Sequence, residues 1–221
     1  MIIIKQKPGV NVDTFSHMVF YIPRNTGQSD SVSNLVIDFK DNRKSYVLAW
    51  VDSIVKEINQ LPKIDFVARI LSSKETSPSG KEPLDILGKA IAKATNSKYC
   101  PKCLTKKQIH RPLKTLTRDQ RINELNNLYK FSLLNCLSAK NEYAKPISLL
   151  IIDDVYTTGT SMDLVCREIR KKYTKDEIII HLFVIGRTTS AKHSLEVPIK
   201  YNQEFFSANQ FPSILDESFM K

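Results

Sequence analysis

Two adjacent carboxylates and a hydroxyl-rich turn are the residues of this chain most able to do chemistry. Asp153 and Asp154 are closely followed by Thr157–Ser161, which reads Thr-Thr-Gly-Thr-Ser. The hydroxyls and backbone N–H groups of such a turn can donate hydrogen bonds to one phosphate, and Gly159 allows close approach of the backbone. Carboxylates beside this turn can accept hydrogen bonds from sugar hydroxyls or bind a metal ion. These residues therefore predict a site for a sugar phosphate.

The flanking residues predict the elements that position this site. Ile147–Ile152 is a short, continuous apolar run typical of a strand buried on both faces. A helix is expected to begin in the turn, with apolar residues recurring at helical spacing. They are Met162, Val165, Cys166, Ile169 and Tyr173. In open α/β sheets ligands bind at the carboxyl ends of strands, and a helix N-terminus attracts phosphate, so the groups are expected at one sheet edge.

Two other interpretations of this stretch were weighed. An apolar strand ending in acidic residues also occurs in NTPases, but that reading needs a G-x-x-x-x-G-K-[ST] loop, which none of the 6 glycines builds. A strand and capped helix with no ligand would place two carboxylates beside a buried strand, which is costly unless they face solvent. A ligand site is therefore the favoured interpretation.

Length and composition predict one globular domain. The 221 residues are 42% hydrophobic and 25% charged, enough for a full core. No apolar run is long enough to span a membrane, and the first residues lack the long apolar core of a signal peptide, so we expect a cytoplasmic protein with reduced cysteines and no membrane partner. The net charge of +10 suits an anionic partner, either nucleic acid or a pyrophosphate-bearing small molecule.

Other elements are expected from local patterns. We expect strands at His17–Ile22, Asn34–Phe39, Ile64–Leu71 and Glu177–Gly186, and helices over about 43–61, from Pro83 onward and over about 118–137. They divide a single domain, 1–221, into an N-terminal β segment at 1–40 (hood or edge), a core at 43–189 and a C-terminal extension at 190–221 packed on the core.

Residues 149–161 resemble the motif that binds 5-phosphoribosyl 1-pyrophosphate (PRPP) in type I phosphoribosyltransferases. The resemblance implies an α/β, Rossmann-like fold with a mainly parallel central sheet flanked by helices and a small hood or N-terminal β appendage. It implies that Asp153 and Asp154 are catalytic, lie beside the ribose hydroxyls and hold Mg²⁺, partly through PRPP or water. The 5′-phosphate would be held by Thr157, Thr158, Gly159, Thr160 and Ser161.

The resemblance also implies a pyrophosphate loop after an earlier strand. By position and residue type this loop is Ser72, Ser73, Lys74 and Glu75, although an ordinary solvated loop would look similar. Residues 98–121 are strongly basic and are interpreted in three ways: a mobile loop closing over PRPP, a nucleic-acid patch, or a solvated face. Further candidate ligand contacts are Arg69, Lys106, Lys107, Arg111 and Arg187.

The cysteines do not predict a zinc site. Cys100 and Cys103 form a C-x-x-C pair, but zinc sites of this kind need further ligands, and His110 is the only other one nearby in sequence. A redox motif is less favoured still, because no thioredoxin-like context surrounds the pair. Cys136 and Cys166 are expected on buried helix faces as small apolar residues.

The whole chain looks most like the ComF-type, competence-associated branch of the phosphoribosyltransferases, although that branch's four-cysteine zinc module and proline-rich first loop are not found in these residues. The resemblance implies Mg²⁺-dependent transfer of phosphoribose from PRPP to a nitrogenous base or related nucleophile, with release of pyrophosphate. The alternative is a non-catalytic PRPP or nucleotide sensor, or a protein associated with nucleic acid through 98–121. A homodimer is a further candidate assembly, and no pattern in 1–40 or 187–221 names the acceptor.

Overall fold

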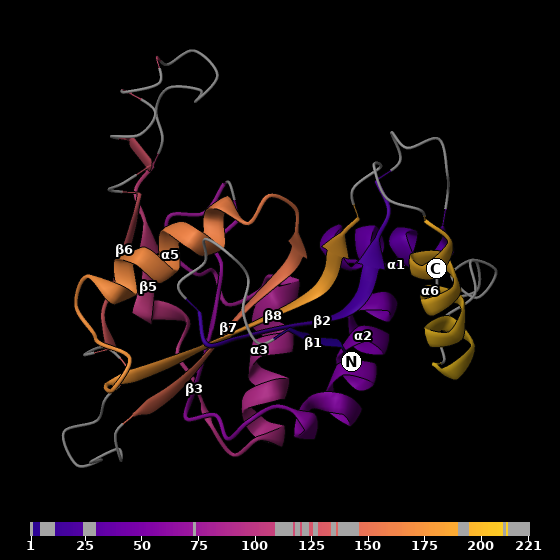
Figure 1. Cartoon of the computed structure of the whole chain (residues 1–221), viewed down its shortest axis with the longest axis horizontal. Helices are drawn as coiled ribbons and strands as arrows, with labels where there is room; N and C mark the ends of the chain where they lie inside the picture. The colour runs from indigo at the N-terminus through magenta and orange to yellow at the C-terminus, as the bar shows by residue number, and fades with distance from the viewer. Residues whose placement is uncertain are drawn as a thin grey trace.

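The computed structural model describes residues 2–4, 12–23, 30–72, 74–108, 117, 120, 124–125, 128–133, 136, 146–189, 195–209 and 211. Within them lies a six-stranded sheet of order β1-β2-β8-β7-β3-β4 (Figure 1). The strands are β1 Ile2–Ile4, β2 Thr14–Tyr21, β3 Phe66–Arg69, β4 Lys98–Tyr99, β7 Ile147–Tyr156 and β8 Ile178–Thr188. β1 pairs antiparallel with β2, and the other neighbours are parallel. The expected mainly parallel sheet is confirmed.

Helices cover both faces of this sheet, which explains why its central strands are continuously apolar. Leu149 and Ile151 of β7 pack with α5 (Thr160–Arg170), whereas Leu150 and Ile152 pack with α1 (Ser31–Lys40), α2 (Lys44–Glu57) and α3 (Pro83–Ala94). Figure 1 shows α5 on one side of the sheet and α2 and α3 on the other. The predicted α/β fold class is therefore confirmed.

The expected strand at Asn34–Phe39 is wrong, because these residues belong to α1. Asp30 caps the helix, since its carboxylate accepts hydrogen bonds from the Ser33 N–H at 2.9 Å and the Ser33 hydroxyl at 2.8 Å. The apolar side chains then point to the core at helical spacing. They are Val32, Leu35, Val36 and Phe39. The cap and this spacing together outweigh the β propensity of the Leu-Val-Ile run.

The N-terminal strands extend the central sheet. β2 lies inside the sheet, hydrogen-bonded to β8 with Phe15 opposite Leu182, and β1 forms its outer edge. The described strands of 1–40 therefore belong to the central sheet. The expected helix over 43–61 is confirmed as α2 followed by a 3₁₀ turn, η2 Ile58–Gln60.

A separate two-stranded antiparallel sheet pairs β5 (Leu104–Lys106) with β6 (Tyr129–Phe131). The helix expected over about 118–137 is therefore wrong at β6. There Tyr129 and Phe131 are buried while Lys130 between them is exposed, which is the alternation of a strand rather than of a helix. A short 3₁₀ turn, η3 Pro101–Cys103, leads into β5.

The helix α6 (Glu196–Ala208) packs at the β2 end of the sheet, beside α1. Asn202 is fully buried and joins these elements, because its amide donates to the Phe20 carbonyl and to the Asp30 carboxylate, each at 2.8 Å. Phe205 and Phe211 contact the Trp50 ring of α2, with centroids 5.5 and 5.0 Å away. No helix among the described residues is long and apolar enough to cross a membrane.

Candidate functional site

Asp153 and Asp154 lie within β7, which continues through Tyr156 instead of ending at Ile152 as expected. Consecutive residues of a strand point to opposite faces, so the two carboxylates diverge at the sheet edge. Asp154 points toward the end of α1, where the Lys40 ammonium lies 3.5 Å from its Oδ2 atom. Both carboxylates also accept backbone hydrogen bonds, Asp153 from the Asp154 N–H at 2.9 Å and Asp154 from the Val155 N–H at 2.6 Å.

Asp153 lies where its charged form is disfavoured. Burial raises the pKa of Asp153 well above its usual value, and the neighbouring charge of Asp154 raises it further. A carboxyl with a raised pKa gains most from a ligand that donates hydrogen bonds or from a bound cation, because either stabilises the ionised form. The pair is therefore suited to sugar hydroxyls or a divalent cation.

The turn after β7 has the backbone shape that the sequence led us to expect. Gly159 has a φ of 77° and caps α5, which begins at Thr160. A Cβ atom at Gly159 would lie 2.0 Å from the Tyr156 hydroxyl, so only glycine fits against this ring. The hydroxyls of Thr158 and Thr160 are 2.9 Å apart and both side chains are exposed. Hydroxyls and helix N–H groups are thus gathered at one end of α5, where an anion is favoured.

The loop after β3 is held by a buried ion network centred on Arg69. Its guanidinium donates to both carboxylate oxygens of Asp85 at 2.7 and 3.0 Å and to both of Glu75 at 2.8 and 2.6 Å. Its remaining N–H donates to the Ile70 carbonyl at 3.2 Å. These bonds use all five donors of an arginine side chain. In this structure Arg69 therefore positions the loop and has no donor left for a ligand.

Glu75 is also committed within the loop, since it accepts the Ser72 N–H at 2.9 Å. Hydrogen bonds from Arg69 and Ser72 lower the pKa of Glu75 against the opposing effect of burial. Lys106 supports the loop from β5: its ammonium donates to the Ser72 carbonyl and its backbone N–H to the Thr76 carbonyl at 2.9 Å. In this structure Lys106 thus contacts the loop backbone.

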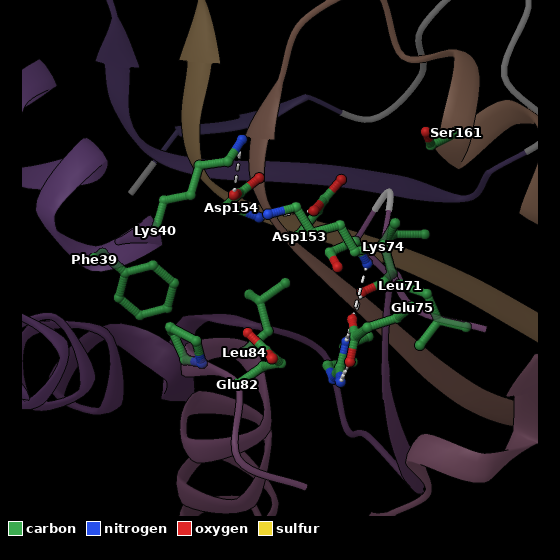
Figure 2. Close-up of a pocket in the computed structure, with 14 residues that line it drawn as sticks. Phe39, Lys40, Leu71, Lys74, Glu75, Glu82, Leu84, Asp153, Asp154 and Ser161 are labelled. Atoms are coloured by element: carbon green, nitrogen blue, oxygen red, sulfur yellow. Dashed lines mark hydrogen bonds and ion pairs between the residues drawn. The ribbon is translucent and has the colours of Figure 1, made fainter. Parts of the chain in front are cut away.

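These elements enclose a cavity of about 450 Å³ (Figure 2). It lies between the end of β7, the loop after β3, the start of α3 and the end of α1. Its lining residues are Phe39, Lys40, Arg69, Ile70, Leu71, Ser72, Lys74, Glu75, Glu82, Pro83, Leu84, Asp153, Asp154 and Ser161. Both predicted carboxylates, one residue of the phosphate turn and three of the predicted pyrophosphate loop therefore line one cavity.

The sequence interpretation missed the contributions of α1 and α3 to this cavity. Figure 2 shows Lys40 and Lys74 on opposite sides of the two carboxylates, with Phe39 and Leu84 below Lys40. Lys40 was missed because α1 was expected to be a strand; the cap at Asp30 was the signal that could have revealed it. The remaining Thr157 is exposed at the start of the turn.

Other candidate contacts lie away from the cavity lining. Lys107 has an exposed side chain after β5, and Arg187 lies on β8 opposite Tyr156. Ser73 and Arg111 lie outside the described residues, as does most of the basic stretch after Lys107.

A metal at this site would need ligands from elsewhere. Among the described residues, no group of three or more His, Cys, Asp or Glu side chains is arranged to hold a metal ion. Mg²⁺, however, commonly binds through one or two carboxylates and takes its other oxygens from water and substrate phosphates. Asp153 and Asp154 fit that mode of binding.

Comparisons with known proteins find only distant likeness. No family model and no curated protein matches the sequence. Among solved structures, the chain is similar to an adenine phosphoribosyltransferase, with 14% identity, coverage of 72% of each chain and a TM-score of 0.34. It is also similar to adenine phosphoribosyltransferase from Saccharomyces cerevisiae, whose structure was solved in complex with an imino-altritol bisphosphate and adenine. That match has 12% identity, covers 66% of this chain and 75% of that chain, and has a TM-score of 0.32. Likeness at this level assigns neither activity nor ligand.

Proposed function

We propose that the protein binds PRPP with Mg²⁺ and transfers its phosphoribosyl group to a nitrogenous base or related nucleophile, releasing pyrophosphate. One observation carries this proposal. A single cavity joins Asp153 and Asp154, Ser161 of the phosphate turn, and Ser72 and Lys74 of the loop after β3. A molecule with a ribose between a phosphate and a pyrophosphate would match three such groups in one place.

The charge of the cavity supports a role for a divalent cation. Its lining holds three cations, Lys40, Lys74 and Arg69, and four carboxylates, namely Glu75, Glu82, Asp153 and Asp154. The formal sum, three minus four, is −1, although the whole chain carries +10. These side chains therefore supply no net positive charge to a polyanion such as PRPP, and a bound cation would offset the carboxylates.

In the proposed reaction Asp153 and Asp154 would hold Mg²⁺, and the bound ion would supply positive charge to offset that of the pyrophosphate. The chain's own groups would bind and orient the substrate. The turn at 157–161 and the start of α5 would hold the 5′-phosphate, and Lys74 would approach the pyrophosphate. Catalysis of this kind depends on positioning and electrostatic stabilisation of an oxocarbenium-like ribose rather than on covalent chemistry by the protein.

Calorimetric titration with PRPP, with and without Mg²⁺, tests the binding proposal. We expect a saturable heat with one site, much weaker when Mg²⁺ is removed. Incubation with PRPP and each free base, followed by detection of pyrophosphate and the nucleotide, tests transfer and identifies the acceptor. The double variant Asp153→Asn with Asp154→Asn should stay folded and lose both signals; full activity in it would refute the assignment.

Binding without turnover of any base would instead favour the sensor alternative. A nucleic-acid role would be seen as DNA or RNA binding that weakens steeply with salt. Membership of the ComF-type branch stays a prediction from the sequence resemblance.

A further inference from the structure

Three cysteines from two distant parts of the chain meet beside the small β5–β6 sheet. Cys100 directly follows β4, and its N–H donates to the Val67 carbonyl at 2.8 Å. The η3 turn then brings Cys103 back onto Cys100, with an N–H to carbonyl distance of 3.2 Å. This C-x-x-C segment is therefore fixed to the central sheet at one end and continues into β5 at the other.

Cys136 reaches the same place through the pairing of β5 with β6. The Ser132 N–H donates to the Cys103 carbonyl at 2.8 Å, which aligns the end of β6 with the C-x-x-C turn. A turn follows, in which the Cys136 N–H donates to the Leu133 carbonyl at 2.8 Å. The Lys98 ammonium of β4 then donates to the Cys136 carbonyl. Four hydrogen bonds between backbone groups and one from the Lys98 side chain thus hold Cys100, Cys103 and Cys136 in place. We call these three residues the cysteine cluster.

The three side chains interact directly. Hydrogen bonds from the Cys100 and Cys103 thiols lower the pKa of Cys136 to about 4, helped by the nearby charge of Lys98. The same bonds, together with burial, raise the pKa of Cys100 and of Cys103. The three thiols therefore share hydrogen bonds that favour ionisation of Cys136. A thiolate is the reactive form of cysteine, and an adjacent thiol can resolve its oxidised product.

The cluster is a thiol site in an otherwise apolar core. Its members are 4%, 1% and 2% exposed, and all are free cysteines in the structure. Among the described residues, no group of three or more potential ligands has the arrangement to hold a metal ion. A single structural cysteine would need no such partners.

We propose that this cluster is an oxidation site, in which Cys136 forms a disulfide with Cys100 or Cys103, and that the bond shifts Ser72 and residues 74–76 of the loop after β3. The second half rests on the proposed function, because that loop lines the cavity assigned to PRPP.

The oxidation balances with a peroxide as the oxidant. The Cys136 thiolate attacks one oxygen of hydrogen peroxide, breaking the O–O bond to give a sulfenic acid and hydroxide. The neighbouring thiol attacks the sulfenic sulfur, forming the S–S bond and releasing water. Two electrons pass from the sulfurs to the peroxide, and the hydroxide takes up a proton from solvent.

Lys106 connects the cluster to the loop. It lies on β5, three residues after Cys103, and contacts the loop at the Ser72 and Thr76 carbonyls. A disulfide requires the two sulfurs to approach to about 2 Å, closer than a hydrogen-bonded pair of thiols. The proposed bond would draw the C-x-x-C turn toward Cys136, and β5 would carry this movement to both contacts.

Disulfide mapping by mass spectrometry tests the first half. The full-length reduced protein is treated with hydrogen peroxide, alkylated and digested. We expect a peptide linking Cys136 to Cys100 or Cys103, while Cys166, whose pKa is raised to about 12 by burial, remains alkylated and serves as the internal control. The variant Cys136→Ser should lose thiols to peroxide about tenfold more slowly, whereas Cys166→Ser should match the wild type. Stoichiometric zinc in the isolated protein, or oxidation of Cys166 as readily as of the cluster, would overturn the site.

PRPP titration of the reduced and oxidised protein tests the second half. We expect about tenfold weaker binding after oxidation, restored by dithiothreitol. Equal affinities despite a mapped disulfide would overturn the link to the loop. If the reduced protein binds no PRPP, the proposed function fails while the mapping still decides the oxidation site; if PRPP binds but no disulfide forms, the site fails and the function stands.

Discussion

Replacing Arg69 with methionine should destabilise the protein by about 3–5 kcal/mol at neutral pH, because it leaves buried carboxylates without their partner. Arg69 and Asp85 have side-chain exposures of 1% and 0%, and Glu75 has 10%. Methionine keeps much of the apolar stem but removes four hydrogen bonds to the two carboxylates. For a domain of this size the loss corresponds to a melting temperature lower by about 6–20 °C.

The pH dependence of this loss distinguishes a buried charge from simple packing. In the wild type, burial opposes ionisation of Asp85, but hydrogen bonds from Arg69 and Tyr99 lower its pKa overall. That stabilisation is present above the unfolded pKa of about 4 and is lost as pH falls below it. Without Arg69, burial raises the folded pKa, so the variant binds protons on folding and loses stability as pH rises. The difference between the two proteins should therefore grow from pH 4 toward pH 8.

Urea denaturation at several pH values measures both effects. Tyr99→Phe is the matched control, because it removes one hydrogen bond to Asp85, of 2.6 Å, and leaves the ion pair in place. We expect that control to cost about 1.5–3 kcal/mol, with a pH dependence of the same sign as that of Arg69→Met but smaller, because Asp85 keeps its ion pair. A loss below about 1 kcal/mol for Arg69→Met, or one that is constant across pH, would refute the assignment of Arg69 as the charge that holds this loop.

Three further changes test other parts of the structure. Gly159→Ala should weaken PRPP binding and lower the unfolding free energy by more than the roughly 1–2 kcal/mol that a left-handed backbone costs, because its Cβ would lie 2.0 Å from the Tyr156 hydroxyl. Gly80→Ala is the control, because Gly80 has a φ of 80° and no atom within 4 Å of an added Cβ. In the same thermal melts and PRPP titrations it should show the backbone cost alone. Burial lowers the pKa of His17 to about 4, so the wild type should lose stability as pH falls from about 6.5 toward 4. In His17→Gln the unfolding free energy, measured by denaturation, should depend less on pH in that window. An unchanged pH slope would contradict this. Asn202→Leu should lower the unfolding free energy by about 1–3 kcal/mol by leaving buried backbone groups unpaired, and a neutral effect in urea would argue against the α6 contact.

Local sequence patterns were sufficient to predict the centre of the fold. β7 and α5 were predicted because a continuous apolar run and a helical repeat are properties of consecutive residues. The run Leu-Val-Ile in 34–39 carries the same apolar signal for either state, so its assignment depended on the cap at Asp30. Because residues 34–39 were expected to form a strand, Lys40 at the end of α1 was not among the predicted site residues.

The other features that the sequence did not predict depend on pairing between residues that are distant in the chain. β5 and β6 are each three residues long, too short for a period to be read, and they are held by a contact between Leu104 and Phe131. The same pairing brings Cys136 to the C-x-x-C turn. From the sequence Cys136 was placed on a buried helix face, where cysteine is an ordinary apolar residue. Its chemistry becomes visible only when the distant segment is in place.

Arg69 shows how the partners of a side chain, which the sequence does not reveal, limit what that side chain can bind. An arginine at the end of a strand, beside a polar loop, is typical of an anion site, and Arg69 does line the cavity. Its partners, however, are Glu75 and Asp85, and one of them lies on the following helix. Because these carboxylates neutralise the guanidinium, the proposed phosphate ligand would depend for positive potential on Lys40, Lys74, backbone N–H groups and a divalent cation. Mg²⁺ dependence of PRPP binding is therefore the property on which the proposed function most directly depends.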